Sequence, residues 1–135
     1  MKKLFVVGLG PGSADTMTAQ ARAALAESDV LCGYTVYTDL VAPLSPDKPV
    51  LTTPMRKEID RCRMALERAV GGETVAMVCS GDAGVYGMAC LIYQLAAEYP
   101  PVDIVIVPGV TAALSGAAVL GAPLSHDFCV ISLSD

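Results

Sequence analysis

The chain has 135 residues, enough for one domain with a buried core. Its 9 basic and 14 acidic side chains give a net charge of -5, which excludes nucleic acid as the expected partner, because phosphate backbones are bound through Lys and Arg. Aromatic residues make up 5% of the chain, too few for a base-stacking surface.

Cysteine and histidine usage predicts no metal site. The five cysteines form no CxxC pair, and a single histidine leaves too few ligands for zinc. We interpret the cysteines as small buried side chains in a reducing compartment, so the predicted location is cytoplasmic. The uncharged stretch 104–125 is long enough to cross a bilayer, but Gly and Pro residues interrupt it. A strand, a turn and a small-residue helix fit it better, and we expect no membrane segment.

Apolar runs alternate with runs of helical periodicity along the chain. Strands are predicted at 4–7, 30–32, 50–51, 75–79, 104–107 and 129–133. Helices are predicted at 18–27, 56–70, 85–98 and 111–120. Several strands are apolar throughout, which is typical of parallel strands buried on both faces. The alternation predicts an α/β fold with a mostly parallel sheet flanked by helices.

The predicted helix 56–70 has the clearest pattern. One face carries its apolar side chains: Ile59, Cys62, Leu66, Ala69 and Val70. Two glycines at 71 and 72 end it. Before it, three prolines at 43, 46 and 49 predict an extended surface loop.

Three glycine-rich turns follow predicted buried strands. They are GLGPG at 8–12, SGDAGVYGM at 80–88 and PGVTA at 108–112. Ligands of open α/β sheets bind beyond the carboxyl ends of the strands, where backbone N–H groups face the crevice. The sequence therefore predicts one small-molecule site formed by these turns.

The first turn does not match a known nucleotide fingerprint. A dinucleotide site requires a third glycine at position 13, which is Ser13, and an acidic residue at the end of the second strand. Asp29 lies at the start of that strand instead. Pro11 also removes one N–H from the turn. The turn could equally be a tight strand-to-helix connection.

The polar residues of these turns each allow two interpretations. Asp82 could stabilise a helix N-terminus or contact a ligand, and the glycines around it favour close approach of a ligand. Thr111 could cap a helix or contact an adenosine or methionine moiety. Tyr34 and Tyr37, after the second strand, could reach the crevice or cover the sheet. The only histidine, His126, is interpreted as a loop residue rather than a general base.

The order of the three turns resembles the tetrapyrrole methylases, which use S-adenosylmethionine in sirohaem and cobalamin synthesis. Three segments more closely resemble the members that methylate carbon 17 of precorrin-3B or cobalt-factor III and contract the macrocycle: 33–37, 80–89 and 126–135. Other members usually carry proline after the Gly-Asp pair, where this chain has Ala83.

The resemblance implies a site and a domain organisation. The cofactor residues would be Pro11, Ser80, Gly81, Asp82, Val85, Thr111 and Ala112. Tyr34 stands where sirohaem-forming relatives carry an aspartate proposed as base, so the acid–base role of that aspartate does not transfer. Ring contraction needs proton transfers, to which Tyr34 or Tyr37 could contribute, and Tyr34 is the predicted catalytic residue. The family has two α/β domains and forms dimers, so residues 1–135 would be the N-terminal domain of a homodimeric enzyme, inactive without the C-terminal domain.

Two alternatives stay open. The chain could belong to a methylase of another tetrapyrrole, of protein or of RNA, although Ala83 and the segment 126–135 argue against this. It could also be a non-catalytic Rossmann-like module.

Overall fold

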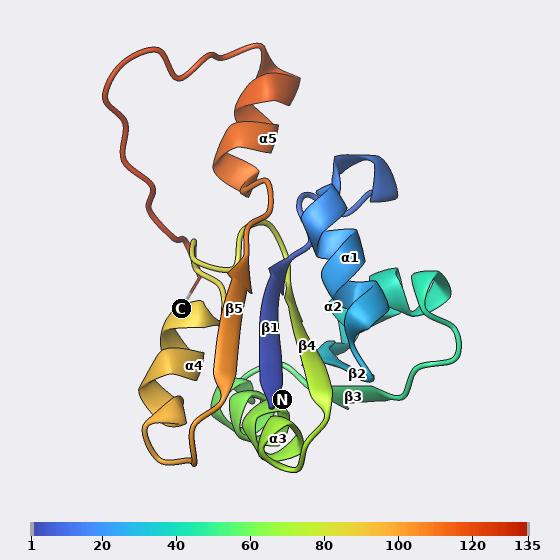
Figure 1. Cartoon of the computed structure of the whole chain (residues 1–135). Coiled ribbons are helices and arrows are strands. Elements are labelled where there is room, and N and C mark those ends of the chain that lie inside the picture. The colour runs from blue at the N-terminus through green and yellow to red at the C-terminus, as the bar shows by residue number, and fades with distance from the viewer. Residues whose placement is uncertain (1, 135) are drawn as a thin grey trace.

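The computed structural model describes residues 2–134 and contains a five-stranded parallel sheet (Figure 1). Its strands are β1 (Lys3–Gly8), β2 (Val30–Tyr34), β3 (Val50–Thr53), β4 (Thr74–Cys79) and β5 (Asp103–Val107). They lie in the order β3-β2-β4-β1-β5, and each pair of neighbours is parallel. The predicted α/β fold and the first five predicted strands are confirmed.

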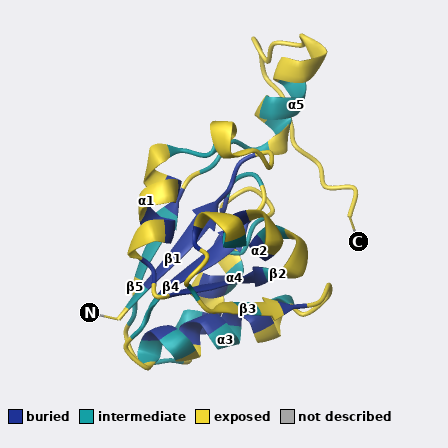
Figure 2. Ribbon diagram, turned by 90° about the vertical axis from the view of Figure 1, so that its right-hand side faces the viewer, coloured by how far each residue is buried: buried dark blue, intermediate teal, exposed yellow. Residues whose placement is uncertain are grey.

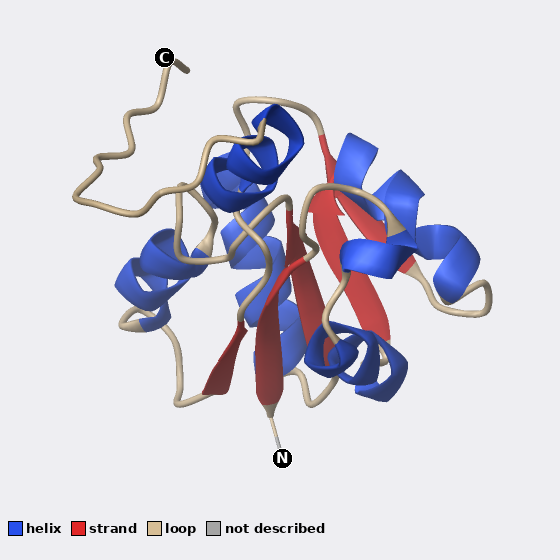
Figure 3. Ribbon diagram, turned by 90° about the horizontal axis from the view of Figure 1, so that it is seen from above, coloured by secondary structure: helices blue, strands red, loops and turns tan. Residues whose placement is uncertain are grey.

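Four helices cover the two faces of the sheet (Figure 3). Helices α1 (Ala19–Glu27) and α2 (Thr35–Val41) lie on one face, and α3 (Glu58–Val70) and α4 (Ala89–Ala96) lie on the other. The fifth, α5 (Ala112–Leu120), stands beyond the carboxyl ends of the strands (Figure 1). Short 3-10 turns occupy Ala14–Thr16 and Ala42–Leu44.

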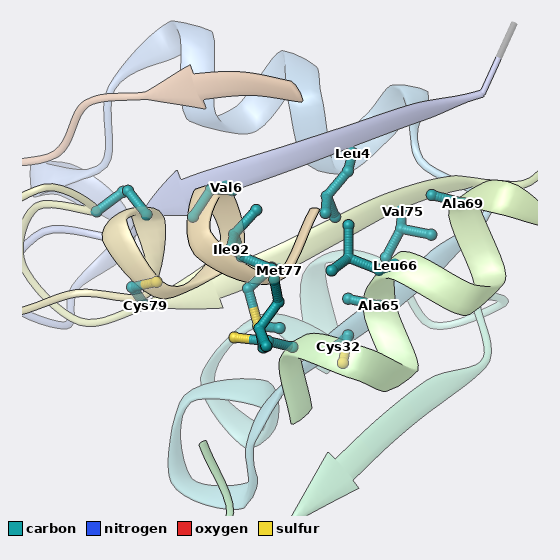
Figure 4. Close-up of a cluster of buried hydrophobic side chains, with 14 of the residues drawn as sticks. Leu4, Val6, Cys32, Ala65, Leu66, Ala69, Val75, Met77, Cys79 and Ile92 are labelled. Carbon is teal, nitrogen blue, oxygen red and sulfur yellow. The ribbon is translucent and has the colours of Figure 1, made fainter. Parts of the chain in front are cut away.

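The core is divided into two layers because side chains of each strand alternate between the faces. In β1, Leu4 and Val6 point toward α3 and α4, while Phe5 and Val7 point toward α1 and α2. Figure 4 shows the layer on the α3 and α4 face, in which Leu66 of α3 lies over the sheet near Leu4. All four strand residues are at most 6% exposed. Central strands buried on both faces explain the continuous apolar runs in the sequence.

Helix α3 follows its predicted pattern with one exception. Cys62, Leu66 and Ala69 are buried, but Ile59 is 54% exposed. In the first turn of α3 a charged residue, Arg61, is buried instead. The helix ends as predicted at the glycine pair: Gly72 adopts φ +106° and donates its N–H to the Ala69 carbonyl at 3.0 Å.

One helix was not predicted, and another begins later than predicted. No helical pattern indicates α2 in the sequence, because Thr35–Val41 is rich in β-branched and aromatic residues. This helix is stabilised by packing, since Thr38 and Val41 are buried against the sheet. Helix α4 begins at Ala89 rather than at 85, because Tyr86 has φ +53° and cannot continue a right-handed helix.

The predicted strand 129–133 is wrong within the described residues. The segment is extended but pairs with no strand of residues 2–134, and it is exposed throughout. A strand needs the hydrogen bonds of a neighbouring strand. Among the described residues, the backbone groups of this segment hydrogen-bond only to the side chain of Tyr86, as described below. Among the helices of residues 2–134, none has the length and apolarity required to span a membrane.

Candidate functional site

The three glycine-rich turns meet at the carboxyl end of the sheet. Gly10 and Gly81 exchange backbone hydrogen bonds at 3.0 and 2.9 Å, and the Leu9 N–H donates to the Cys79 carbonyl at 2.8 Å. These bonds extend the β1–β4 pairing into the turns. Residues that are 70 positions apart in the chain therefore form one surface, as the parallel topology requires.

Close backbone packing explains why the third turn carries a glycine. A Cβ atom at Gly109 would collide with the carbonyl oxygen of Gly81 and come within 2.6 Å of the Gly8 oxygen. A Cβ at Gly8 would in turn lie 2.8 Å from the Gly109 nitrogen. The three turns approach one another more closely than a side chain at Gly8 or Gly109 would allow.

Asp82 links two of these turns. Its Oδ1 accepts the Gly109 N–H at 2.9 Å, and its Oδ2 accepts the Gly84 N–H at 2.9 Å. The carboxylate thus fixes the turn before α4 to the turn before α5. Bonds from a charged acceptor to backbone amides are stronger than neutral ones. In this structure Asp82 therefore positions the turns from outside the cavity that they enclose.

The turns and the first half of α5 enclose a cavity of about 700 Å³. This volume is within the range of small-molecule sites. Its lining residues are Gly10, Pro11, Ser80, Gly81, Val85, Tyr86, Thr111, Ala112, Ala113, Ser115, Gly116, Val130, Ile131 and Ser132. Six of the seven residues that the sequence assigned to a cofactor lie in this one lining, and the seventh, Asp82, braces it.

The N-terminus of α5 contributes backbone donors to this cavity. Thr111 caps the helix without a side-chain hydrogen bond, and its carbonyl accepts the N–H groups of Leu114 and Ser115. Within residues 2–134, no acceptor is hydrogen-bonded to the N–H of Ala112 or Ala113. These free amides and the helix dipole favour a polar or negative group of a ligand.

A segment that the sequence did not assign to the site closes one side of the cavity. The Tyr86 hydroxyl donates to the Val130 carbonyl at 2.9 Å and accepts the Ser132 N–H at 3.2 Å. Residues 130–132 are held beside the turns in this way. Sequence patterns give no signal for this contact, because it joins a loop tyrosine to backbone groups 44 and 46 residues away.

Tyr34, the expected catalytic residue, lies outside this cavity. Its ring contacts Tyr37 edge-on, with centroids 5.4 Å apart, and lies 5.7 Å from the Arg61 guanidinium carbon. Tyr37 and Arg61 border a smaller cavity of about 60 Å³. Ser80 and Tyr86 line both cavities, so the two are adjacent.

The five cysteines and His126 are absent from the lining of the larger cavity, although Cys79 lines the smaller one. Burial raises the pKa of Cys32 and Cys62 to about 12, and that of Cys79 to about 11, from an ordinary 9.0. His126 is exposed. No group of three or more potential metal ligands occurs among residues 2–134. The arrangement can hold and orient a small molecule with backbone and hydroxyl groups, and it offers no activated thiol.

Comparison with known proteins places this site in a family. The model of the tetrapyrrole (corrin/porphyrin) methylases matches residues 3–135. The chain belongs to this family. The resemblance seen in the turns of the sequence is therefore confirmed.

Two relatives of this methylase domain have closely related names. It is 48% identical over 133 residues to a probable cobalt-factor III C(17)-methyltransferase of Salmonella typhimurium. It is 47% identical over 136 residues to a precorrin-3B C(17)-methyltransferase of a Sinorhizobium species. Each alignment covers 98% of this chain, but 55% and 53% of the relatives. The chain spans about half the length of the curated relatives that it matches.

Solved structures of methylases share the fold. The methyltransferase CobJ superposes with a TM-score of 0.91 at 43% identity, over 98% of this chain and 56% of that one. A uroporphyrin-III C-methyltransferase of Thermus thermophilus, complexed with S-adenosylhomocysteine, gives 0.76 at 26% identity, over 93% and 54%.

Proposed function

We propose that this methylase domain forms the N-terminal part of an enzyme that methylates carbon 17 of precorrin-3B or cobalt-factor III, with ring contraction, in cobalamin biosynthesis. The names of the two relatives support the substrate. The observation that carries the proposal is structural. Three turns far apart in sequence enclose one cavity, and six residues expected from the family pattern line it.

The residues of the cavity fit S-adenosylmethionine. Its volume can hold a molecule of this size. Small side chains at Ala112 and Gly116 leave room along α5, and Val85 supplies an apolar wall. The free amides of Ala112 and Ala113 suit the carboxylate of the methionine moiety. When bound, this cofactor supplies an electrophilic methyl group on a sulfonium.

The role of the chain is mainly to position the reactants. Rigid backbone pairing at Gly10 and Gly81 and the two Asp82 bonds fix the cavity wall. Holding two reactants in line accounts for much of the rate of a displacement. We assign a proton transfer during ring contraction to the Tyr34 hydroxyl. Tyr34 is the last residue of β2, and its ring contacts Tyr37 and Arg61 of the smaller cavity.

The rest of the site would come from a second domain and a second copy. The matched relatives are about twice as long as the chain. Helix α5 exposes Leu114, Val119 and Leu120 by 52–88%. Large apolar surfaces of this kind are typical of contacts between domains or subunits. A cytoplasmic homodimer of two-domain chains is the proposed assembly.

Binding of S-adenosylhomocysteine tests the cofactor assignment. In a two-domain protein that carries this sequence, we expect calorimetry to give a 1:1 complex and the ligand to raise the melting temperature. Ala112→Leu would fill the cavity beside α5 and weaken binding. Ala118→Leu, on the same helix but outside the cavity lining, is the matched control and should bind normally. If the unaltered two-domain protein binds no S-adenosylhomocysteine, the chain would instead be the non-catalytic module.

The catalytic assignment requires turnover measurements. In a two-domain protein that carries this sequence, Tyr34→Phe should slow methylation of cobalt-factor III and leave the affinity for S-adenosylhomocysteine unchanged. Tyr93→Phe, an exposed tyrosine on α4, is the control. Normal turnover with reduced stability would make Tyr34 a packing residue.

A further inference from the structure

One buried cation in the domain has no counter-ion. Arg61 of α3 is 5% exposed, yet no carboxylate of residues 2–134 forms an ion pair with it. The two other arginines of this helix are paired: Arg63 with Glu98 and Arg68 with Glu73. Buried charges in proteins are normally paired, because an uncompensated one is costly to remove from water.

The existing contacts of Arg61 are all with neutral groups. Its Nε donates to Thr53 Oγ1 at 2.9 Å, and its Nη2 donates to the Pro54 carbonyl at 3.2 Å. Its Nη1 meets only the thioether of Met88 at 3.8 Å, a weak acceptor. The Tyr34 ring adds a cation–π contact. The guanidinium is thus held in place while its charge stays uncompensated.

A cavity of about 60 Å³ opens against this guanidinium. Its polar lining is Arg61, Tyr37, Ser80 and Tyr86. The volume equals about two water molecules, which suits a carboxylate group and excludes a macrocycle. Since Ser80 and Tyr86 also border the larger cavity, a ligand there could place a side chain at Arg61.

We propose that Arg61 binds a peripheral carboxylate of the tetrapyrrole substrate and so fixes the orientation of the macrocycle beside the cofactor. This inference rests on the proposed function. An arginine binds a carboxylate through two parallel N–H bonds, which selects direction as well as charge. The carboxylate of the cofactor is the less suitable partner, because Arg61 does not line the larger cavity, where the free amides of α5 already serve that role.

The first test removes the charge. Titration of a two-domain protein that carries this sequence with cobalt-factor III, followed by absorbance, should show affinity at least tenfold weaker for Arg61→Met, as expected for loss of a charged hydrogen bond. Arg61→Lys should recover part of it. Arg63→Met, two residues further along α3 and 38% exposed, is the control and should bind normally. Calorimetry with S-adenosylhomocysteine should give the same affinity for wild type and for these three variants.

The second test keeps Arg61 and supplies the missing counter-ion. In Met88→Glu, a carboxylate replaces the thioether beside Nη1, at the N-terminal end of α4, where a negative charge is favourable. We expect this variant to melt no lower than wild type and to bind cobalt-factor III at least tenfold more weakly. It separates ligand binding from a purely structural role of Arg61, even if Arg61→Met fails to fold.

The outcomes distinguish this inference from the function on which it rests. Wild-type affinity for cobalt-factor III in Met88→Glu and in Arg61→Lys or Arg61→Met overturns the Arg61 site and leaves the proposed function intact. Weakening of S-adenosylhomocysteine binding alone also overturns it, because the carboxylate would then be the cofactor's. A two-domain protein that carries this sequence unaltered and binds neither molecule overturns the proposed function itself.

Discussion

Helices α4 and α5 are both apolar in composition, but one is packed in the core and the other is not. Both are short and apolar, ACLIYQLA and AALSGAAVL, and each follows a glycine-rich turn of the site. Helix α4 buries Ala89, Ile92 and Leu95 against the sheet and α3, whereas α5 has no buried residue. Figure 2 shows α5 and the segment after it in yellow and teal, away from the dark blue core.

The difference comes from what each turn does with the chain. The 80–88 turn returns the chain along the sheet, so that α4 joins the core layer on that face and packs beside α3. The turn at 108–111 directs α5 away beyond the strand ends, where it forms a wall of the cavity. Apolar composition therefore predicts a helix in both places, but it does not distinguish a core helix from a helix that serves a site or an interface.

Thiol labelling gives the largest contrast between core and periphery. Cys32, Cys62 and Cys79 are buried and keep their protons, while Cys90 on the outer side of α4 and Cys129 are exposed. Because thiolate is the reactive form, we expect two thiols to react fast with Ellman's reagent at pH 8 and three only after unfolding. Five fast thiols in the folded chain would contradict this burial.

The same thiols fix the sign of an alkaline pH effect. Between the ordinary pKa of 9.0 and the folded values of about 11 to 12, the folded chain retains protons that the unfolded chain has lost. The free energy of unfolding should therefore fall as the pH rises above about 9. Cys32→Ala should flatten this dependence in urea titrations at pH 8 and 10.

Truncation of one side chain on each helix compares their packing directly. Ile92 on α4 is fully buried, and Val119 on α5 is 88% exposed. Ile92→Ala should lower the free energy of unfolding by about 3 kcal/mol, and Val119→Ala by less than about 0.5 kcal/mol. Urea denaturation measures both. Equal losses would mean that α5 is covered in solution, for instance by a second copy.

Two glycines near α5 should respond with opposite sign. Gly109→Ala places a methyl group against the backbone of Gly8 and Gly81, and we expect a loss of about 2–3 kcal/mol. Gly116→Ala meets nothing within 4 Å and lies inside the helix, so it should gain up to about 1 kcal/mol. Thermal unfolding of the two variants, compared with wild type, tests whether the turn at Gly109 is tightly packed and the helix at Gly116 is not.

The sequence predicted the architecture and the site lining better than it predicted the contacts. Buried apolar strands and glycine turns are local patterns, so β1 to β5 and the meeting of the three turns could be predicted from them, whereas the individual lining residues came from the family resemblance. Three features could not. Helix α2 is stabilised by the packing of Thr38 and Val41. Residues 129–133 have an apolar strand pattern but pair with no strand among the described residues. The hydrogen bonds of Tyr86 join segments that are distant in sequence.

Asp82 shows the same limit at one residue. Its position in a glycine turn indicated a role in the site, and its acceptors-only chemistry suited either a ligand or a backbone amide. The structure brings the Gly109 N–H to it from 27 residues away, a contact that no sequence spacing reveals.

Removal of the Asp82 carboxylate should loosen both turns at once. Asp82→Ala loses two charged hydrogen bonds to backbone amides and should lower the free energy of unfolding by about 2 kcal/mol. Affinity for S-adenosylhomocysteine should fall as well, by about 1–3 kcal/mol. Asp82→Asn retains one acceptor oxygen, so its stability and its affinity should lie between those of wild type and Asp82→Ala. Unchanged affinity in calorimetry would show that the cavity wall does not depend on this residue.

The smallest effect is expected where the last segment meets the turn before α4. Tyr86→Phe removes one hydroxyl that bonds to Val130 and Ser132, and it keeps the ring in place. Exposed hydrogen bonds contribute about 1 kcal/mol or less, so global stability should hardly change. Hydrogen exchange of the Ser132 amide should accelerate severalfold, while amides of β4 exchange as before. If Ser132 exchanges equally fast in wild type and variant, residues 130–132 are not held at the cavity in solution, and its open side belongs to the ligand or to a second domain.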